Sequence, residues 1–282
     1  MKEINIQEEY IYINDGVYHK KIGPVDLQPL AFMSNYRYFL KFAYNGANFH
    51  GWQSQPNATS VQECIERAMT MVLRSETALT GAGRTDAGVN AAIMYAHFDV
   101  DTEIKDIRSF VARLNSIVGK DIAIYDAIPV HADAHARFDA TARTYKYFVH
   151  TTKSPFLYPF SWKANCSLDF DLMNEAAEKL YDFTDFTSFS KLHTDVKTNN
   201  CKITHARWER EGEQWVFTIT ADRFLRNMVR AIVGTLVDVG RGKITIEQFC
   251  DIIEQKNRCS AGTSMPGNAL FLWKVEYPYI KE

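Results

Sequence analysis

The sequence lacks a long apolar run, a cysteine pair at metal-binding spacing and an excess of charge of either sign. No apolar stretch approaches the roughly 20 residues that span a bilayer, and no leader resembling a signal peptide opens the chain. The five cysteines are scattered and never form a Cys-x-x-Cys pair, which favours reduced thiols over a disulfide framework or a zinc site. We therefore expect a cytoplasmic protein without membrane association or metal.

Charge is distributed unevenly, although the formal net charge is only −2. Residues 137–163 hold five bases against one acid, and residues 223–243 also hold five bases against one acid. Two basic stretches in a nearly neutral protein predict a positive surface for a polyanion. Two separate solvated faces remain the alternative on charge alone.

The hydrophobic patterns predict a fold in which strands and helices are interspersed. Their spacing is not the regular alternation of βαβ units, which favours an α+β fold with an antiparallel sheet. Residues 1–34 differ from the rest, because they show no clear period and carry five acids against three bases. The predicted strands lie near 36–44, 92–100, 123–128, 144–150, 202–209, 215–220 and 270–277, and the helices near 61–72, 107–114, 171–181, 224–239 and from 245. Ser60-x-x-Glu63 is a capping-box pattern that opens the first helix, and Thr245-x-x-Gln248 opens the last.

The sharpest local feature is the segment GAGRTDAGV at 81–89, in which three glycines bracket Arg84 and Asp86. Glycines permit tight turns and let a ligand approach the backbone closely, so Asp86 is a candidate functional carboxylate. A dinucleotide-binding fingerprint is excluded, because its third glycine would fall on position 86 and a strand follows. A structural turn in which Asp86 bonds its own backbone remains the alternative.

Further short blocks follow along the chain from about residue 36 to residue 277. Together with GRTDAGV at 83–89, their order and spacing resemble the TruA-type tRNA pseudouridine synthases, and GRTDAGV is similar to the catalytic motif of that family. A single block would carry little weight, whereas the ordered set is specific. The blocks are YNG at 44–46, FHGWQ at 49–53, SVQE at 60–63, HARF at 135–138, ARTYKY at 142–147, DFTSF at 185–189, FLRNMVR at 224–230 and VGTL at 233–236.

The resemblance implies two similar α+β halves around a continuous, mostly antiparallel sheet, with a central basic cleft. On this interpretation residues 1–34 are an N-terminal extension, 35–136 form the N-terminal half with the catalytic loop, and 137–282 form the C-terminal half. The resemblance also implies isomerisation of uridine to pseudouridine in the anticodon stem-loop of tRNA, at uridines 38, 39 and 40. It implies a homodimer that uses no metal and no organic cofactor.

Three residues are implied as catalytic by their motif positions. Asp86 is the carboxylate that acts on the ribose and base, as nucleophile or as base. Arg230 is the cation that keeps this carboxylate charged and oriented when a flipped base covers it. Tyr145 matches the tyrosine that stacks on the target uracil and takes the C5 proton, although the alternation at 144–149 is equally typical of an ordinary strand.

Four arginines are implied as contacts to the RNA. Arg84 resembles the residue that takes the place of the flipped nucleotide in the helix. Arg137, Arg143 and Arg226 are expected to bind phosphates, which positions the RNA without selecting bases.

Two departures from the family pattern bear on the site. Asn90 stands where the family usually has His, and Asn268-Ala269 replaces Gly-Leu. Asn90 retains hydrogen bonding but not charge. A catalytically inactive RNA-binding paralogue and a synthase acting on another RNA site therefore remain alternatives. The pair His131 and His135 has the spacing of two metal ligands, but no third ligand is evident nearby.

Overall fold

The computed structural model describes residues 36–191 and 198–281. The chain divides into residues 1–34 and residues 35–282, and the expected N-terminal extension lies outside the described residues. Among the helices of the described residues, none is both long enough and apolar enough to cross a membrane.

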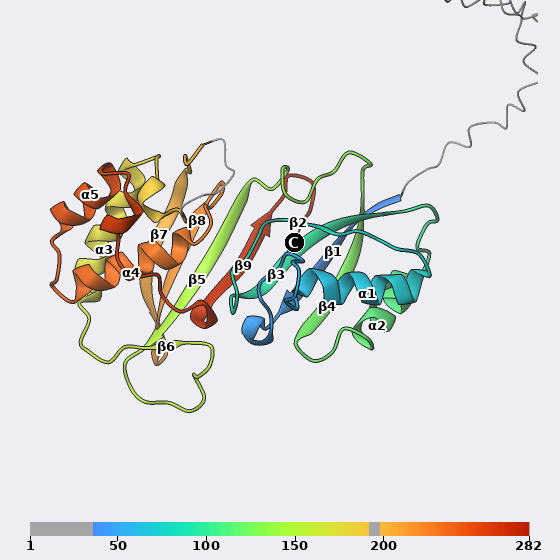
Figure 1. The fold of residues 1–282 in the computed structure, drawn as a ribbon, viewed down its shortest axis with the longest axis horizontal. Coiled ribbons are helices and arrows are strands. Elements are labelled where there is room, and N and C mark those ends of the chain that lie inside the picture. The colour runs from blue at the N-terminus through green and yellow to red at the C-terminus, as the bar shows by residue number, and fades with distance from the viewer. Residues whose placement is uncertain (1–35, 192–197, 282) are drawn as a thin grey trace, which may run out of the picture. The chain divides into compact units, whose positions relative to one another are not determined.

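Within the described residues, nine strands form one mixed sheet (Figure 1). Its order is β4-β1-β3-β9-β5-β8-β7, with β2 paired to β3 and β6 paired to β5. Only β3–β9 and β5–β6 pair in parallel, so the expected mostly antiparallel α+β architecture is confirmed. The strands are β1 (Tyr36–Tyr44), β2 (Thr80–Gly81), β3 (Asn90–Val100), β4 (Ile122–Val130), β5 (Ala142–His150), β6 (Trp162–Lys163), β7 (Ile203–Glu211), β8 (Gln214–Ala221) and β9 (Leu270–Glu276).

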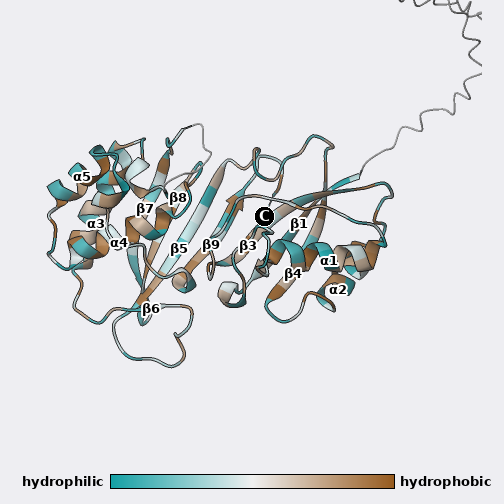
Figure 2. Ribbon diagram, viewed as in Figure 1, coloured by the Kyte–Doolittle hydropathy of each residue, from teal (hydrophilic) through white to brown (hydrophobic). Residues whose placement is uncertain are grey.

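The helices fall into two groups, one over each end of the sheet (Figure 1). Helix α1 follows its predicted cap, because the Ser60 side chain accepts the Glu63 N–H. Its ribbon carries both hydrophilic and hydrophobic residues (Figure 2), as expected of a helix with one buried face. The helices are α1 (Val61–Leu73) and α2 (Ile107–Asn115) in the first group, and α3 (Phe170–Glu178), α4 (Met228–Gly240) and α5 (Ile246–Glu254) in the second.

Two hydrophobic cores meet at the middle of the sheet. One contains buried residues of α1 and α2, and the other contains buried residues of α3, α4 and α5. Leu270 belongs to the second core and Leu272 to the first. Because residues two apart on a strand share a face, both helical groups cover the same side of the sheet. Tyr145 packs against both cores and so marks their junction.

Helix α4 begins later than its apolar pattern predicts. The sequence favoured a helix from 224, but the helix starts at Met228, so the prediction was wrong by one turn. Asn227 has a left-handed backbone with φ +67, which a continuous right-handed helix does not accept. Its side-chain amide donates to Ser264 Oγ at 2.6 Å, which stabilises this break. Residues 222–227 therefore form a loop, and Arg226 lies on that loop.

Candidate active site

Asp86 lies in the loop that joins β2 to β3. The loop is held at both ends by backbone bonds, because Ala82 N–H donates to Tyr95 O at 2.8 Å and Gly88 N–H donates to Phe49 O at 3.2 Å. Val89 N–H donates to the Asp86 carbonyl at 3.2 Å, and the Asp86 carboxylate bonds arginine side chains rather than the backbone of its own loop. The side chain of Asp86 is 21% exposed, so the carboxylate is sheltered but reachable.

The segment after β1 supports this loop from the side. The Thr85 hydroxyl bonds the Tyr44 hydroxyl at 2.8 Å and accepts the Trp52 N–H at 3.1 Å. Gly51 has φ +94, and a Cβ there would lie 2.3 Å from the Thr85 carbonyl, so only glycine allows this approach. The blocks YNG and FHGWQ are separate from GRTDAGV in the sequence, but in the fold they contact it and support it.

The Asp86 carboxylate faces two arginines from the C-terminal part of the chain. Arg230 Nη1 lies 3.2 Å from Asp86 Oδ2, and Arg226 Nε lies 3.5 Å from Asp86 Oδ1. Arg230 is also bound by its Nε to the Met265 carbonyl at 2.5 Å, whereas the Arg226 side chain is 50% exposed. Arg230 is thus the fixed partner of Asp86 and Arg226 the looser one.

Tyr145 lies on β5, between β8 and β9, opposite Ile219 and Leu272. Burial raises the pKa of Tyr145 to about 12; the nearby Arg143 opposes this rise and Asp86 adds to it. The ring edge packs against Phe224 at a centroid distance of 5.1 Å. Tyr145 is therefore a neutral phenol at physiological pH, close enough to Asp86 to feel its charge.

The predicted RNA contacts occupy different environments. Arg84 is exposed and lies two residues before Asp86. Arg137 is exposed, with its guanidinium 5.8 Å from the Phe138 ring centre. The guanidinium of Arg143 instead points into the protein and bonds backbone carbonyls.

Asn90 supports the base of the loop that carries Asp86 rather than the carboxylate itself. Its Oδ1 accepts the Gly46 N–H at 2.8 Å, and its Nδ2 donates to the Asn268 carbonyl at 2.8 Å. Asn268 in turn donates from its side chain to the Pro159 carbonyl. The two departures from the family pattern are therefore in direct contact, and both provide neutral hydrogen bonds.

Sequence reasoning assigned no role to Thr85, Phe224 and the Met265 carbonyl. Thr85 lies in the block GRTDAGV and Phe224 opens the block FLRNMVR, so membership of these blocks was a sequence signal for a role at the site. The Met265 contact uses a backbone atom, which no side-chain pattern reveals.

The histidine pair does not form part of a metal site in the described residues, where no group of three ligating side chains is found. The His135 ring packs against His97 at 4.6 Å and against Phe138 at 4.2 Å between ring centres. The His131 ring packs against Tyr279 at 4.9 Å. These rings are packed as aromatic side chains.

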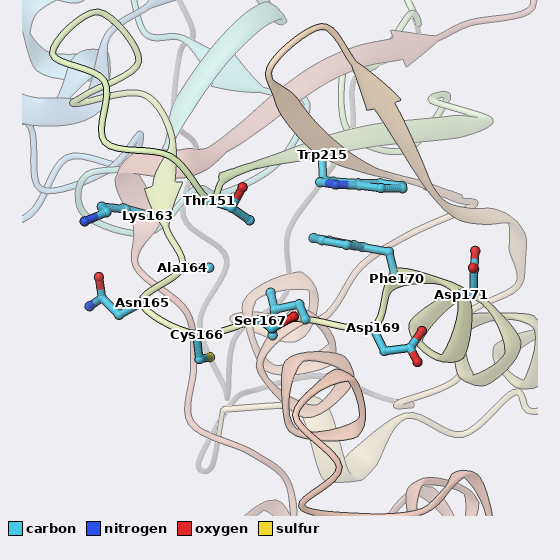
Figure 3. A pocket seen from close by; sticks show the side chains of 11 residues that line it. Thr151, Lys163, Ala164, Asn165, Cys166, Ser167, Asp169, Phe170, Asp171 and Trp215 are labelled. Atoms are coloured by element: carbon cyan, nitrogen blue, oxygen red, sulfur yellow. The ribbon is translucent and has the colours of Figure 1, made fainter.

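A surface pocket of about 760 Å³ lies elsewhere, beside β6 and the start of α3 (Figure 3). Phe170 and Trp215 stack on each other within it, with ring centres 4.1 Å apart. Because they cover each other's faces, neither ring presents both faces to a ligand. None of the residues predicted for the site lines this pocket.

Comparison with known proteins places the chain in a family. The family model described as tRNA pseudouridine synthase matches residues 176–278. A tRNA pseudouridine synthase A from Bacteroides fragilis is 59% identical over 247 residues, which are 87% of this chain and 98% of that protein. One from Parabacteroides distasonis is 59% identical over 242 residues, which are 86% and 96% of the two chains. One from Colwellia psychrerythraea is 36% identical over 244 residues, which are 86% and 94%. The chain therefore belongs to the tRNA pseudouridine synthase A family, and the resemblance stated from the sequence is confirmed.

Proposed function

We propose that this protein isomerises uridine to pseudouridine in tRNA, with Asp86 as the catalytic carboxylate. The observation that carries the proposal is the contact of Asp86 with Arg230 at 3.2 Å. This contact brings together two motif blocks whose residues Asp86 and Arg230 are 144 positions apart, beside Tyr145. Membership of the tRNA pseudouridine synthase A family supports it.

The reaction breaks the bond between ribose C1′ and uracil N1, turns the base, and joins C1′ to C5. The C5 proton leaves and N1 gains a proton, so the reaction is an isomerisation with no net change in atoms or electrons. Asp86 acts either on C1′ as a nucleophile or on a ribose proton as a base. In both cases the Arg230 guanidinium fixes the direction of the carboxylate before the substrate arrives.

Tyr145 provides the surface on which the extracted uracil stacks. Extracting a base costs a few kcal/mol, and one aromatic stack returns roughly 1–3 kcal/mol. Burial raises the pKa of Tyr145 to about 12, so its hydroxyl is protonated. The phenol therefore accepts the C5 proton only if it gives up its own hydroxyl proton. Phe224 holds the ring at right angles, which limits its rotation.

The proposed substrate site is the anticodon stem-loop, with uridines 38, 39 and 40 as targets. Arg84 is exposed on the catalytic loop and is the proposed replacement for the flipped nucleotide. Arg137 and Arg226 are more exposed than Arg230 and available to phosphates. These three arginines form the proposed basic cleft.

We further propose that the protein works in the cytoplasm as a homodimer. The support for a second copy is the uncovered aromatic surface around the segment between β5 and β6. Phe156 is 92% exposed and Tyr158 is 71% exposed, and the neighbouring Phe160 packs on Phe271 of β9. Light scattering of the purified protein measures the mass directly, and a monomer at micromolar concentration would contradict the homodimer.

The experiment that tests the function is pseudouridine mapping in total tRNA from a strain in which the gene is deleted. We expect pseudouridine to be lost at 38, 39 and 40 and restored by the wild-type gene but not by Asp86→Asn. Intact modification in the deletion strain, or loss at another RNA site alone, would contradict the proposal. The first outcome would indicate a catalytically inactive RNA-binding paralogue, and the second would indicate a synthase that acts on another RNA site.

A further inference from the structure

Arg143 has both Nη nitrogens of its guanidinium engaged with backbone carbonyls. Nη1 donates to the Asp222 carbonyl at 2.8 Å and to the Ala140 carbonyl at 3.3 Å. Nη2 donates to the Arg137 carbonyl at 2.7 Å and to the Ala82 carbonyl at 2.9 Å. A guanidinium has five N–H groups, of which four are on the two Nη atoms. The fork formed by Nη1 and Nη2 is therefore already occupied by carbonyls.

The four carbonyls belong to the segments that carry the site. Ala82 lies at the start of the loop that bears Asp86. Asp222 begins the loop that leads to Arg226 and then to Arg230 on α4. The remaining two carbonyls, those of Arg137 and Ala140, lie in the loop that joins β4 to β5. One side chain thus joins the backbones on which the carboxylate, its arginine partners and Arg137 are mounted.

The side chain of Asp222 also holds the start of the loop 222–227. Asp222 Oδ1 accepts the Lys202 N–H at 2.8 Å and the Arg223 N–H at 2.7 Å. The side chain of Asp222 therefore fixes the loop to the edge of β7, while its carbonyl fixes it to Arg143. These contacts fix the first residue of the loop that carries Arg226.

Arg143 holds this position without a carboxylate partner. In the part of the chain that the structure describes, no Asp or Glu oxygen lies within 4.0 Å of its guanidinium nitrogens. Burial lowers the pKa of Arg143 from its ordinary value, yet an arginine remains charged under all physiological conditions. A lysine has one nitrogen with three donors, so it satisfies at most three of the four carbonyls and from a single point.

We propose that Arg143 is a positioning residue that sets the catalytic loop of Asp86 against the loop of Arg226 and Arg230, and that it is not a phosphate contact. The proposal rests on the proposed synthase activity. It assigns Arg143 a role that differs from its sequence-based prediction. Two residues further along β5, Tyr145 receives the flipped base, so the same strand carries both the receptor for the base and the link between the loops.

Arg143→Lys and Arg143→Gln together test the proposal against the phosphate role. In both variants we expect the turnover rate at saturating tRNA to fall about 10- to 100-fold, as a displacement of about 1 Å between reacting groups would cause. In Arg143→Gln, which removes the charge that a lysine would keep, the dissociation constant for tRNA should stay within about threefold, and the salt dependence of binding should keep its slope. Loss of a phosphate contact would instead reduce that slope by about one. Weaker binding with a reduced slope and unchanged saturated turnover would overturn the proposal, as would wild-type behaviour throughout.

Two controls separate position from general stability. Arg113→Lys removes another arginine-to-carbonyl bond, which joins Arg113 Nη2 on α2 to the Val72 carbonyl on α1 at 3.2 Å. We expect the turnover of this variant to be unchanged. Arg137→Gln removes an exposed arginine, and we expect it to weaken binding and reduce the salt slope. If Arg143→Lys and Arg143→Gln both fail to fold at low temperature, the residue serves the fold in general and the proposal is overturned.

Hydrogen exchange supplies a readout that does not depend on activity. In Arg143→Lys we expect faster exchange in the peptides that cover 81–89 and 222–227, with unchanged exchange in α1 and α2. Uniform exchange rates would contradict the linking role. If wild-type protein forms no pseudouridine but the exchange result holds, the proposed function fails while the link between the loops stands.

Discussion

Asp86 and Arg230 are separated by 144 positions in the sequence, yet Asp86 Oδ2 and Arg230 Nη1 lie 3.2 Å apart. The parallel pairing of β3 with β9, at Asn90 and Ala91 with Phe271 and Leu272, brings the two parts of the sheet together. The loop that carries Asp86 immediately precedes Asn90, and Met265, which binds Arg230, precedes β9. The ion pair therefore lies where the two parts of the sheet join.

Asp86→Asn should abolish pseudouridine formation and leave tRNA binding nearly unchanged. The amide keeps the size of the side chain but cannot act as nucleophile or base. Turnover on tRNA transcripts and a binding titration measure the two quantities. Asp101→Asn, on the exposed turn after β3, is the matched control and should keep full activity. Measurable turnover by Asp86→Asn would eliminate this carboxylate as the catalyst.

Arg230→Lys should reduce turnover by about 10- to 100-fold, because a hydrogen bond between charged groups contributes about 1.5–3 kcal/mol. Arg226→Gln should affect turnover less and tRNA binding more, because Arg226 is half exposed and 3.5 Å from Asp86. Steady-state kinetics of both variants test this order. Arg241→Lys, at the other end of α4, serves as control. A larger loss of turnover in Arg226→Gln than in Arg230→Lys would reverse the assignment.

Tyr145→Phe and Tyr145→Ala separate the ring from its hydroxyl. The Phe variant keeps the stacking surface, so we expect wild-type tRNA binding and slower turnover. The Ala variant loses the stack as well, and binding of tRNA should weaken by about tenfold or more. Binding titrations and single-turnover rates distinguish the two effects. Wild-type turnover by Tyr145→Phe would leave stacking as the only role of Tyr145.

Binding of tRNA should weaken steeply as salt is raised, because each phosphate contact releases condensed counterions. Arg84 and Arg137 are exposed and suited to such contacts. We expect the double-logarithmic slope of affinity against salt to be reduced by about one in Arg137→Gln. A binding constant that does not change between low and physiological salt would argue against a basic RNA-binding surface.

Stability should fall in mild acid because of His97. Burial lowers the pKa of His97 to about 4 from the ordinary 6.5, and its Nδ1 accepts the Ala136 N–H at 3.1 Å, which requires the neutral ring. Between these pH values the unfolded chain binds the proton and the folded chain does not. This contribution is complete above about pH 6.5 and is lost towards pH 4, by about 1–3 kcal/mol.

Urea unfolding at pH 7.5 and pH 5 measures this loss. His97→Asn should show a smaller difference between the two pH values, because the amide oxygen accepts the same N–H and does not titrate. His205→Asn on β7 is the matched control. Burial also lowers the pKa of the neighbouring His135, so part of the pH dependence should remain. An unchanged pH dependence in His97→Asn would show that His97 is not its source.

Local structure was predictable where side-chain patterns decide it. The strand at β1 and the caps at Ser60 and Thr245 were found as expected, because alternation and capping act within a few residues. The start of α4 was not predicted correctly, because the left-handed backbone of Asn227 depends on its bond to Ser264, 37 positions away. The order of the strands and their shared helical face could not be read from local patterns either.

The sequence alone determined the family, the candidate carboxylate Asp86 and its expected arginine, because these depend on ordered motifs that one chain displays directly. The tertiary structure decided which atoms meet. It showed Arg230 held on the Met265 carbonyl, Asn90 bound to backbone rather than to Asp86, and Arg143 turned inward onto four carbonyls. The physical reason is that backbone acceptors are the same at every residue, so their use by a side chain depends on the packing of distant segments and leaves no local trace.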